Sequence, residues 1–317
     1  MSDIVRFQRD GAALLRRLKL RARILDLTRA FFHDLGFIEV ETPIVCSSPG
    51  VEVHLKALET TVARHHMYLT TSPEFHMKRL LAAGMDRIFQ VTRAFRDGER
   101  GRRHNPEFTI LEWYRTGCDY NAIMQDCEEL LAHLAVVLYG VPALPEARGA
   151  RPAVDLSPPW ERVTFHQAFT RAGLSTEGLS RDERTLAFVE RVEPSLGRTH
   201  GTFLTEYPAD DASLARLKPK DPSVAERFEA YAGGLELANG FSELCDADAY
   251  LDRCMADLAE RRRLGLPEYP IDARYVAMLR DGLPECAGVA VGMDRVVMLL
   301  SGAASIEDVI AFPLELA

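Results

Sequence analysis

The sequence predicts an α+β fold in which helices pack against a mixed, mainly antiparallel sheet. Long strand-like runs follow one another through hairpins or loops, and helical segments are grouped between them. The strict alternation of strand and helix that builds a doubly wound parallel sheet is missing from the sequence. We expect one domain over residues 1–317, with a smaller segment inserted at about 142–200.

The chain is predicted to open with a long helix and a short strand. Apolar residues from Leu14 to Leu35 recur at helical spacing, and Gly36 ends the pattern. Residues 37–41 then alternate apolar and acidic side chains, as in a strand, and Pro43 terminates the run.

A second helix is predicted from its capping signals. The run Thr71-Ser72-Pro73-Glu74 combines a hydroxyl cap, a proline at the first turn and an acid near the positive helix end. We expect this helix to continue to about Gly84. Strands at 87–95 and 107–115, joined by a long polar loop, and a helix at about 121–139 follow.

The segment 142–159 is rich in Pro, Ala and Arg and has no hydrophobic period, which is typical of a linker. It leads into a smaller mixed segment at about 160–200. The remaining predicted elements are strands at 202–207 and 224–244, a helix at about 247–264 and a strand–turn–helix unit at 286–301.

Composition excludes several classes of protein. No run approaches 18 apolar residues, so we expect no membrane span. Residues 1–10 lack the apolar core of a secretory signal, and the six cysteines form no C-x-x-C pair, which indicates a cytoplasmic protein with reduced thiols. The net charge of −9 argues against a nucleic-acid partner without excluding one, because local arginine clusters are present.

The loop between the two central strands, within Phe95–Phe108, is dense in arginine. Arginine offers phosphate a planar fork and never loses its charge, so the loop suits a polyphosphate; a solvated charged loop is the alternative. Side chains alternate along the following strand, so one of its faces carries Phe108, Ile110, Glu112 and Tyr114. An acid and a phenol among apolar residues indicate a small-molecule pocket; the alternative is a Glu paired with a neighbouring Arg.

A predicted hairpin places two carboxylates close together. Gly233-Gly234 reads as a two-residue turn, which pairs Tyr231 with Glu236 and leaves Glu229 on the same face. Neighbouring carboxylates repel unless a cation lies between them, and Mg²⁺ is held by few oxygen ligands completed by phosphates. The alternative is that each acid meets an arginine on an adjacent element.

Strict alternation along the second hairpin strand directs Glu243 away from the face that carries Glu236. A bulge at Asn239-Gly240 would return Glu243 to that face.

The run 288–298 is a short apolar strand that ends at Gly292 and leads directly into a helix with Arg295 in its first turn. Glycine lets a flat ligand approach the backbone, and an arginine at the positive end of a helix indicates a bound anion. Taken alone, strand–glycine–helix turns are also typical of purely structural connections.

In this order, the motifs resemble the three signature motifs of class II aminoacyl-tRNA synthetases, and most closely the lysyl subgroup. The long helix and the strand ending at Pro43 resemble the first motif, and that motif forms the dimer interface in the family. The second is similar to 95–115 and the third to 288–295. Residues 71–74 and 236–244 resemble the family segments that surround the amino acid.

The resemblance implies a class II synthetase-like catalytic core that uses ATP and Mg²⁺ to activate a small carboxylic acid as an adenylate. By position, Arg96 contacts the α-phosphate and the attacking carboxylate. Arg295 holds the γ-phosphate, with adenine between it and Phe108, while Glu229 and Glu236 coordinate Mg²⁺. Catalysis then consists of in-line positioning and charge neutralisation, without a protein nucleophile.

The resemblance also assigns the amino-acid side. Glu74 takes the α- or β-amino group, and Glu243 and Tyr114 hold the side-chain ammonium. The other residues implied to bind are Asp97, Gly98, Glu99, His104, Asn105, Leu237 and Gly292 for the nucleotide, and Ser72, Pro73, Glu112 and Asn239 for the amino acid.

The sequence departs from the family after the second-motif arginine. The family places Glu two residues later, where it reads the adenine amino group, but Gly98 occupies that position and the acid stands at Glu99. Either the loop backbone adjusts or the main chain reads adenine.

Lysyl-tRNA synthetases carry an anticodon-binding OB-fold before the first motif, whereas that motif begins near residue 12 here. The resemblance is therefore to stand-alone paralogues, which attach (R)-β-lysine to a lysine of elongation factor P. It implies a homodimer with a protein acceptor rather than tRNA, and α-lysine and β-lysine suit the same residue types.

Three alternatives share this core. A tRNA-charging lysyl-tRNA synthetase would use the same active site. An asparagine-synthetase-like paralogue fits less well, because Glu243 and Tyr114 favour a cationic side chain. A non-catalytic regulatory paralogue would typically lose motif residues that this chain retains, namely Arg96, Glu229, Glu236 and Arg295.

Overall fold

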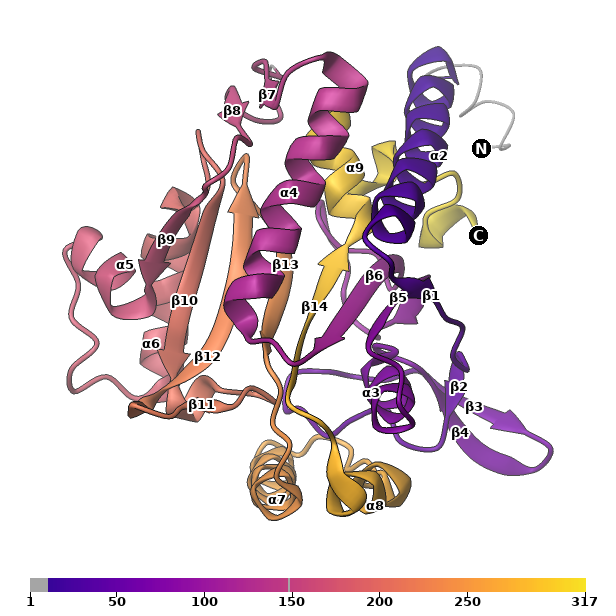
Figure 1. The fold of residues 1–317 in the computed structure, drawn as a ribbon, viewed down its shortest axis with the longest axis vertical. Helices are drawn as coiled ribbons and strands as arrows, with labels where there is room; N and C mark the ends of the chain where they lie inside the picture. Colours follow the sequence, from indigo (N-terminus) through magenta and orange to yellow (C-terminus); the bar gives the residue numbers. More distant parts are fainter. Residues whose placement is uncertain (1–10, 148) are drawn as a thin grey trace.

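The computed structural model describes residues 11–147 and 149–317 (Figure 1). The predicted absence of a signal in residues 1–10 lies outside the described residues. The helices are α2 (Gly11–Asp34), α3 (Glu74–Ala82), α4 (Tyr120–Tyr139), α5 (Phe165–Arg171), α6 (Arg181–Ala187), α7 (Ala247–Arg263), α8 (Ala273–Gly282) and α9 (Met293–Ser301).

Most strands belong to one large sheet. The strands are β1 (Ile38–Glu39), β2 (Val45–Cys46), β3 (Glu59–Val62), β4 (His65–Leu69), β5 (Arg87–Phe95), β6 (Glu107–Thr116), β7 (Ala143–Leu144), β8 (Val154–Asp155), β9 (Glu161–Thr164), β10 (Thr202–Pro208), β11 (Leu217–Lys218), β12 (Asp221–Ala232), β13 (Leu235–Ser242) and β14 (Cys286–Gly292).

The large sheet has the order β1-β5-β6-β14-β13-β12-β10-β9, with β11 paired to β12. The pairs β1–β5 and β9–β10 are parallel, and the other pairs in this sheet are antiparallel. The prediction of a mixed, mainly antiparallel sheet flanked by helices is therefore confirmed. The strand expected at 37–41 is shorter, since only two of its residues pair in β1.

The two faces of the sheet have different roles. Figure 1 shows α2, α4 and α9 lying over one face, while α7 and α8 lie together at one end of the sheet. The core between the sheet and the helices α2, α4 and α9 contains Leu111 and Trp113 of β6 and Val291 of β14. Because side chains alternate along a strand, the residues between them point to the opposite face, which is left for the site.

The first and third motifs are tied together at the start of α9. Arg21 of α2 reaches Asp294, with a 2.5 Å separation between guanidinium and carboxylate, and donates to the Thr109 hydroxyl at 2.7 Å. Asp294 also accepts from the backbone N–H of Thr109 at 2.8 Å. These contacts fix α2, β6 and the start of α9 relative to one another.

The start of α3 follows the predicted capping run with one change. The N-cap position is occupied by Pro73, which was expected one residue further on, and the Ser72 hydroxyl before it accepts from the backbone N–H of Glu74 at 3.1 Å. Thr71 instead donates to the Pro49 carbonyl at 2.9 Å. The helix ends at Ala82, two residues before the predicted stop.

The segment 142–200 lies at the far edge of the sheet. Its strand β9 runs parallel to β10. The side chains of Phe165 and Phe169 on α5 pack with Leu204 and Tyr207 of β10 in a small core of their own. Within the described part of the chain, none of the helices is long and apolar enough to cross a membrane.

Candidate active site

Two adjoining cavities occupy the sheet face opposite α4. The first, of about 320 Å³, has walls that include Arg96, Arg103, His104 and Arg295, and we call it the cationic cavity. The second, of about 250 Å³, is lined by four carboxylates and is called the acidic cavity; they are Glu52, Glu74, Glu112 and Glu243. The walls of both cavities include Arg96, Asn239 and Ala290, so the two spaces meet there.

The structure brings most of the predicted site residues into these walls. The cationic cavity contains Arg96, Glu99, His104, Asn105, Phe108, Glu236, Leu237, Asn239, Gly292 and Arg295. The acidic cavity contains Ser72, Glu74, Arg96, Glu112, Tyr114, Asn239 and Glu243. Four predicted residues lie outside both walls, namely Pro73, Asp97, Gly98 and Glu229.

Local contacts explain why three of these four lie outside. Pro73 occupies the N-cap position of α3, so its role is in the helix start. The Asp97 carboxylate pairs with Lys56 at 2.5 Å. Gly98 has φ of 80°, a left-handed conformation that glycine adopts without strain, and it makes the turn of the loop.

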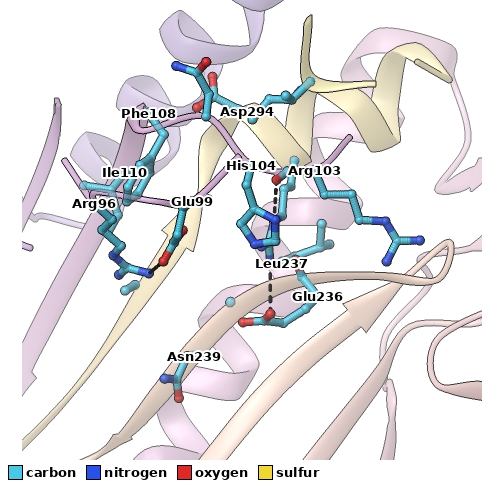
Figure 2. Close-up of a pocket in the computed structure, with 16 residues that line it drawn as sticks. Arg96, Glu99, Arg103, His104, Phe108, Ile110, Glu236, Leu237, Asn239 and Asp294 are labelled. Atoms are coloured by element: carbon cyan, nitrogen blue, oxygen red, sulfur yellow. Dashed lines mark hydrogen bonds and ion pairs between the residues drawn. The ribbon is translucent and has the colours of Figure 1, made fainter. Parts of the chain in front are cut away.

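This turn also accounts for the departure from the family sequence. Because Gly98 turns the backbone, the next residue, Glu99, reaches the wall of the cationic cavity and lies 3.5 Å from the Arg96 guanidinium (Figure 2). Glu99 therefore lines the cationic cavity, although it stands one position later in the sequence than the family's glutamate.

Arg96 is the residue at the junction of the two cavities. Its guanidinium lies 5.1 Å from the centre of the Phe108 ring, within cation–π distance. Its Nε is buried and has no hydrogen-bond partner among the described residues. A buried donor without a partner is uncommon, and a charged N–H of this kind can bind an anion.

Arg295 is held at the opposite wall by strand β13 and by the loop between β5 and β6. It donates to the Glu236 carbonyl at 2.9 Å and to the Glu236 carboxylate at 3.0 Å. It also lies 2.7 Å from Nε2 of His104. Burial and the nearby Arg295 charge lower the pKa of His104, so its imidazole stays neutral and accepts from the guanidinium.

Glu229 and Glu236 lie close enough for their charges to interact, and each has an arginine partner. Glu229 accepts from Arg227 at 2.7 Å and from the Tyr231 hydroxyl at 2.6 Å. Burial raises the pKa of Glu229, Arg227 opposes the rise, and the Glu236 charge adds to it. Within residues 11–147 and 149–317, no group of three or more His, Cys, Asp or Glu side chains is arranged to hold a metal ion, so a cation at this pair would need further ligands from outside the protein.

The bulge in this hairpin is displaced from its predicted position. Tyr231 pairs with Glu236 as predicted, but the next pair is Ala230 with Ala238, so Leu237 is the extra residue. The predicted bulge at Asn239-Gly240 is therefore wrong in place. The observed one still turns Asn239 and Glu243 toward the cavities.

The acidic cavity is built around Glu112 on β6. Its carboxylate accepts from the Ser72 hydroxyl at 2.6 Å and from the Tyr114 hydroxyl at 2.7 Å. Burial, with the Glu74 charge, raises the pKa of Glu112 to about 7. Tyr114 fits because residue 288 is glycine: a Cβ at Gly288 would lie 2.1 Å from the Tyr114 ring.

Lys78 is a site residue that sequence reasoning missed. Its side chain is fully buried in α3 and forms ion pairs with both Glu74 and Glu243. Burial opposes its charge, but the two carboxylates hold the pKa of Lys78 well above its ordinary value. Glu243 keeps one buried oxygen, Oε1, without a partner among the described residues. The i, i+4 spacing of Glu74 and Lys78 was the available signal.

Comparison with known proteins identifies the family. A family model for class II tRNA synthetases (D, K and N) matches residues 7–316. The chain belongs to this family. The resemblance read from the three motifs and the expected synthetase core are thereby confirmed.

Similar proteins of known name agree with this assignment over their whole length. The proteins named elongation factor P–(R)-β-lysine ligase from Yersinia pestis (strain Pestoides F) and from Yersinia pseudotuberculosis serotype O:1b (strain IP 31758) are each 40% identical to the chain over 328 aligned residues. The alignment covers 100% of this chain and 100% of each relative.

Proposed function

We propose that the chain uses ATP to activate a lysine-type amino acid, (R)-β-lysine, as an adenylate and transfers it to a lysine side chain of elongation factor P. The names of the full-length relatives support this reaction. The observation that carries it in the structure is the place of Arg96, which stands where an arginine-rich cavity meets a carboxylate-rich one. Adenylate formation joins a phosphate to a carboxylate at such a junction.

The cationic cavity is assigned to ATP. Arg96 contacts the α-phosphate and the attacking carboxylate, and its unpartnered Nε supplies a donor for them. Arg295 binds the γ-phosphate, and adenine lies between Arg295 and the Phe108 ring. Fixed positive charge at both ends of the triphosphate favours in-line attack and the departure of pyrophosphate.

Glu236, with Glu229 beside it, is assigned to Mg²⁺. Two repelling carboxylates at the edge of a phosphate cavity are a donor set that suits this ion, because Mg²⁺ takes one or two carboxylates and completes its shell with phosphate oxygens and water. The ion would neutralise charge on the departing pyrophosphate. Arg227 pairs with Glu229 and Arg295 pairs with Glu236, which fixes the positions of the two carboxylates.

The acidic cavity is assigned to the amino acid. Glu74 takes the amino group nearest the carboxylate, while Glu243, through Oε1, and Tyr114 hold the side-chain ammonium. Ser72, Glu112 and Asn239 complete the wall. Lys78 pairs with two of the four carboxylates and offsets one negative charge, so the excess of carboxylates in the wall matches a ligand with two ammonium groups.

The proposal includes a cytoplasmic homodimer formed through the first motif. Four large apolar side chains in and next to α2 and β1 are exposed on the single chain, at 37–55% of their full area, which suits a protein interface. They are Leu15, Leu35, Ile38 and Ile44. Elongation factor P, rather than tRNA, is the acceptor.

The decisive experiment measures ATP–pyrophosphate exchange with α-lysine, (R)-β-lysine, ornithine and asparagine, followed by transfer to purified elongation factor P or to tRNA. We expect exchange with lysine-type substrates only, greatest with (R)-β-lysine, and label on the protein alone. Label on tRNA would instead identify a tRNA-charging enzyme, and no exchange with any substrate would identify a non-catalytic paralogue.

A further inference from the structure

Glu52 is a carboxylate of the acidic cavity for which the roles above have no use. It shares the wall with Arg96 and Glu74. Its carboxylate forms no ion pair or hydrogen bond with the side chain of another residue in the described part of the chain, whereas Glu74, Glu112 and Glu243 all have such partners. Burial, and then the Glu74 charge, raise the pKa of Glu52 to about 7.

The loop that carries Glu52 has no helix or strand, yet it is held firmly in place. Arg261 of α7, 1% exposed, donates to the carbonyls of Glu52 at 2.7 Å, Val53 at 3.2 Å and Leu55 at 3.0 Å. The same guanidinium stacks 4.4 Å from the centre of the Tyr269 ring. Because this buried arginine binds three backbone carbonyls of the loop, it fixes the position of the Glu52 side chain at the cavity.

Charged groups surround Glu52 from several elements. Arg96 favours its ionised form, while Glu74 of α3 and Asp257 of α7 disfavour it. The other ionisable residues in the wall of the same cavity are Cys46, His76, Glu112, Tyr114, Arg227 and Glu243. Glu52 therefore shares the acidic cavity with Arg96, beside which the activated carboxyl group would form, and the charge of Arg96 acts on the Glu52 carboxyl.

Transfer to the acceptor requires a step that adenylate formation does not. A lysine amine has a pKa of about 10.4, so only about one molecule in a thousand is neutral at pH 7.4. The attacking nitrogen must lose a proton close to the activated carbonyl. A group with a pKa near the working pH, held within the cavity, is suited to accept that proton.

We infer that Glu52 is the general base that deprotonates the acceptor lysine for attack on the adenylate. This inference rests on the proposed function. The ammonium gives one proton to the Glu52 carboxylate, and the amine nitrogen then bonds to the carbonyl carbon. The carbon–oxygen bond to phosphate breaks, and AMP leaves with that electron pair. The nitrogen releases its second proton to the AMP phosphate or to water, and Glu52 returns its own proton to solvent.

The test separates activation from transfer in the variant Glu52→Gln, which keeps the shape of the side chain. We expect ATP–pyrophosphate exchange within about twofold of wild type, and single-turnover transfer to elongation factor P slowed by about 10²-fold. Hydroxylamine, a nucleophile that is already largely neutral at pH 7, should trap the adenylate equally well in both proteins. Wild-type transfer should level off above pH of about 7, while transfer by the variant should keep rising with pH.

The exposed acid Glu59, in the nearby strand β3, provides the matched control, and Glu59→Gln should transfer at the wild-type rate. Equal transfer by wild type and Glu52→Gln would overturn the assignment of the base. A parallel loss of exchange and transfer would also overturn it, because Glu52 would then bind the amino acid. Exchange without any transfer to elongation factor P by wild type would overturn the proposed function, and the base with it.

Discussion

The two cavities meet at one arginine but carry their charges in opposite ways. In the cationic cavity the charged side chains remain partly open to water, with Arg96 27% and Glu236 34% exposed. In the wall of the acidic cavity, Glu243 is 0% exposed, and so is Lys78, with which it pairs. A hydrated triphosphate thus meets charged groups that are partly exposed to water, whereas the amino acid meets charged groups that are buried.

This difference separates affinity from discrimination. Partly exposed arginines attract any polyanion, and dissolved salt screens that attraction. Buried charges interact in a less polar medium, where a missing or misplaced ammonium leaves a carboxylate without a partner at high cost. We therefore expect the cationic cavity to supply the chemistry and the acidic cavity to choose the substrate.

The largest effect is expected where the cavities join. Arg96→Ala removes the donor that serves both phosphate and carboxylate, so ATP–pyrophosphate exchange should fall by about 10³-fold. The melting temperature should stay near that of wild type, because Arg96 is partly exposed. Arg93→Ala, on the exposed side of β5, is the control and should retain exchange. Full exchange by Arg96→Ala would remove Arg96 from the mechanism.

The next largest effect is expected for the buried ion pairs of Lys78. Lys78→Met leaves Glu74 and Glu243 without their shared cation, and the free energy of unfolding should fall by about 3 kcal/mol, measured by urea denaturation. Arg171→Met breaks an ion pair with Glu161 that is open to water, and stability should change little. Similar losses in both variants would show that burial does not set the energy of the pair.

Glu243→Gln should separate the two ligands. The Kd of (R)-β-lysine should rise by about 10²-fold, because a neutral amide replaces the carboxylate that receives the side-chain ammonium. The Kd of ATP should stay within about twofold, as determined by calorimetry. Glu285→Gln, at an exposed site, is the control. Equal weakening of both ligands would contradict the division into two cavities.

The sequence predicted features that depend on neighbouring residues better than features that depend on distant contacts. Strand β5 and the hairpin turn at Gly233-Gly234 were predicted correctly because period and turn chemistry are local. The bulge was misplaced because Gly240 serves another purpose. A Cβ there would lie 2.7 Å from the Gly288 carbonyl oxygen and from the Phe228 ring, so glycine permits close approach of neighbouring strands.

The buried charges were the harder part of the site to foresee. The spacing of Glu74 and Lys78 is typical of a surface ion pair, and only the packing of α3 against the sheet shows that it is buried. Glu52 lies in a loop without hydrophobic period, and its position depends on Arg261, which is 209 residues away in the sequence. The arginines of the cationic cavity, in contrast, stand in local motifs.

The smallest effect concerns salt and sharpens the contrast in exposure. Raising the ionic strength from about 0.05 M to about 0.5 M shortens the screening length from roughly 14 Å to roughly 4 Å. The Kd of ATP should therefore rise several-fold at constant free Mg²⁺, while the Kd of (R)-β-lysine should change less than twofold, since the partners of its ammonium groups are shielded from dissolved ions. Titrations with potassium chloride and with potassium glutamate would separate screening from competition by the anion. Equal salt dependence of the two ligands would mean that the acidic cavity is as open to water as the cationic one, and the division of labour between them would no longer hold.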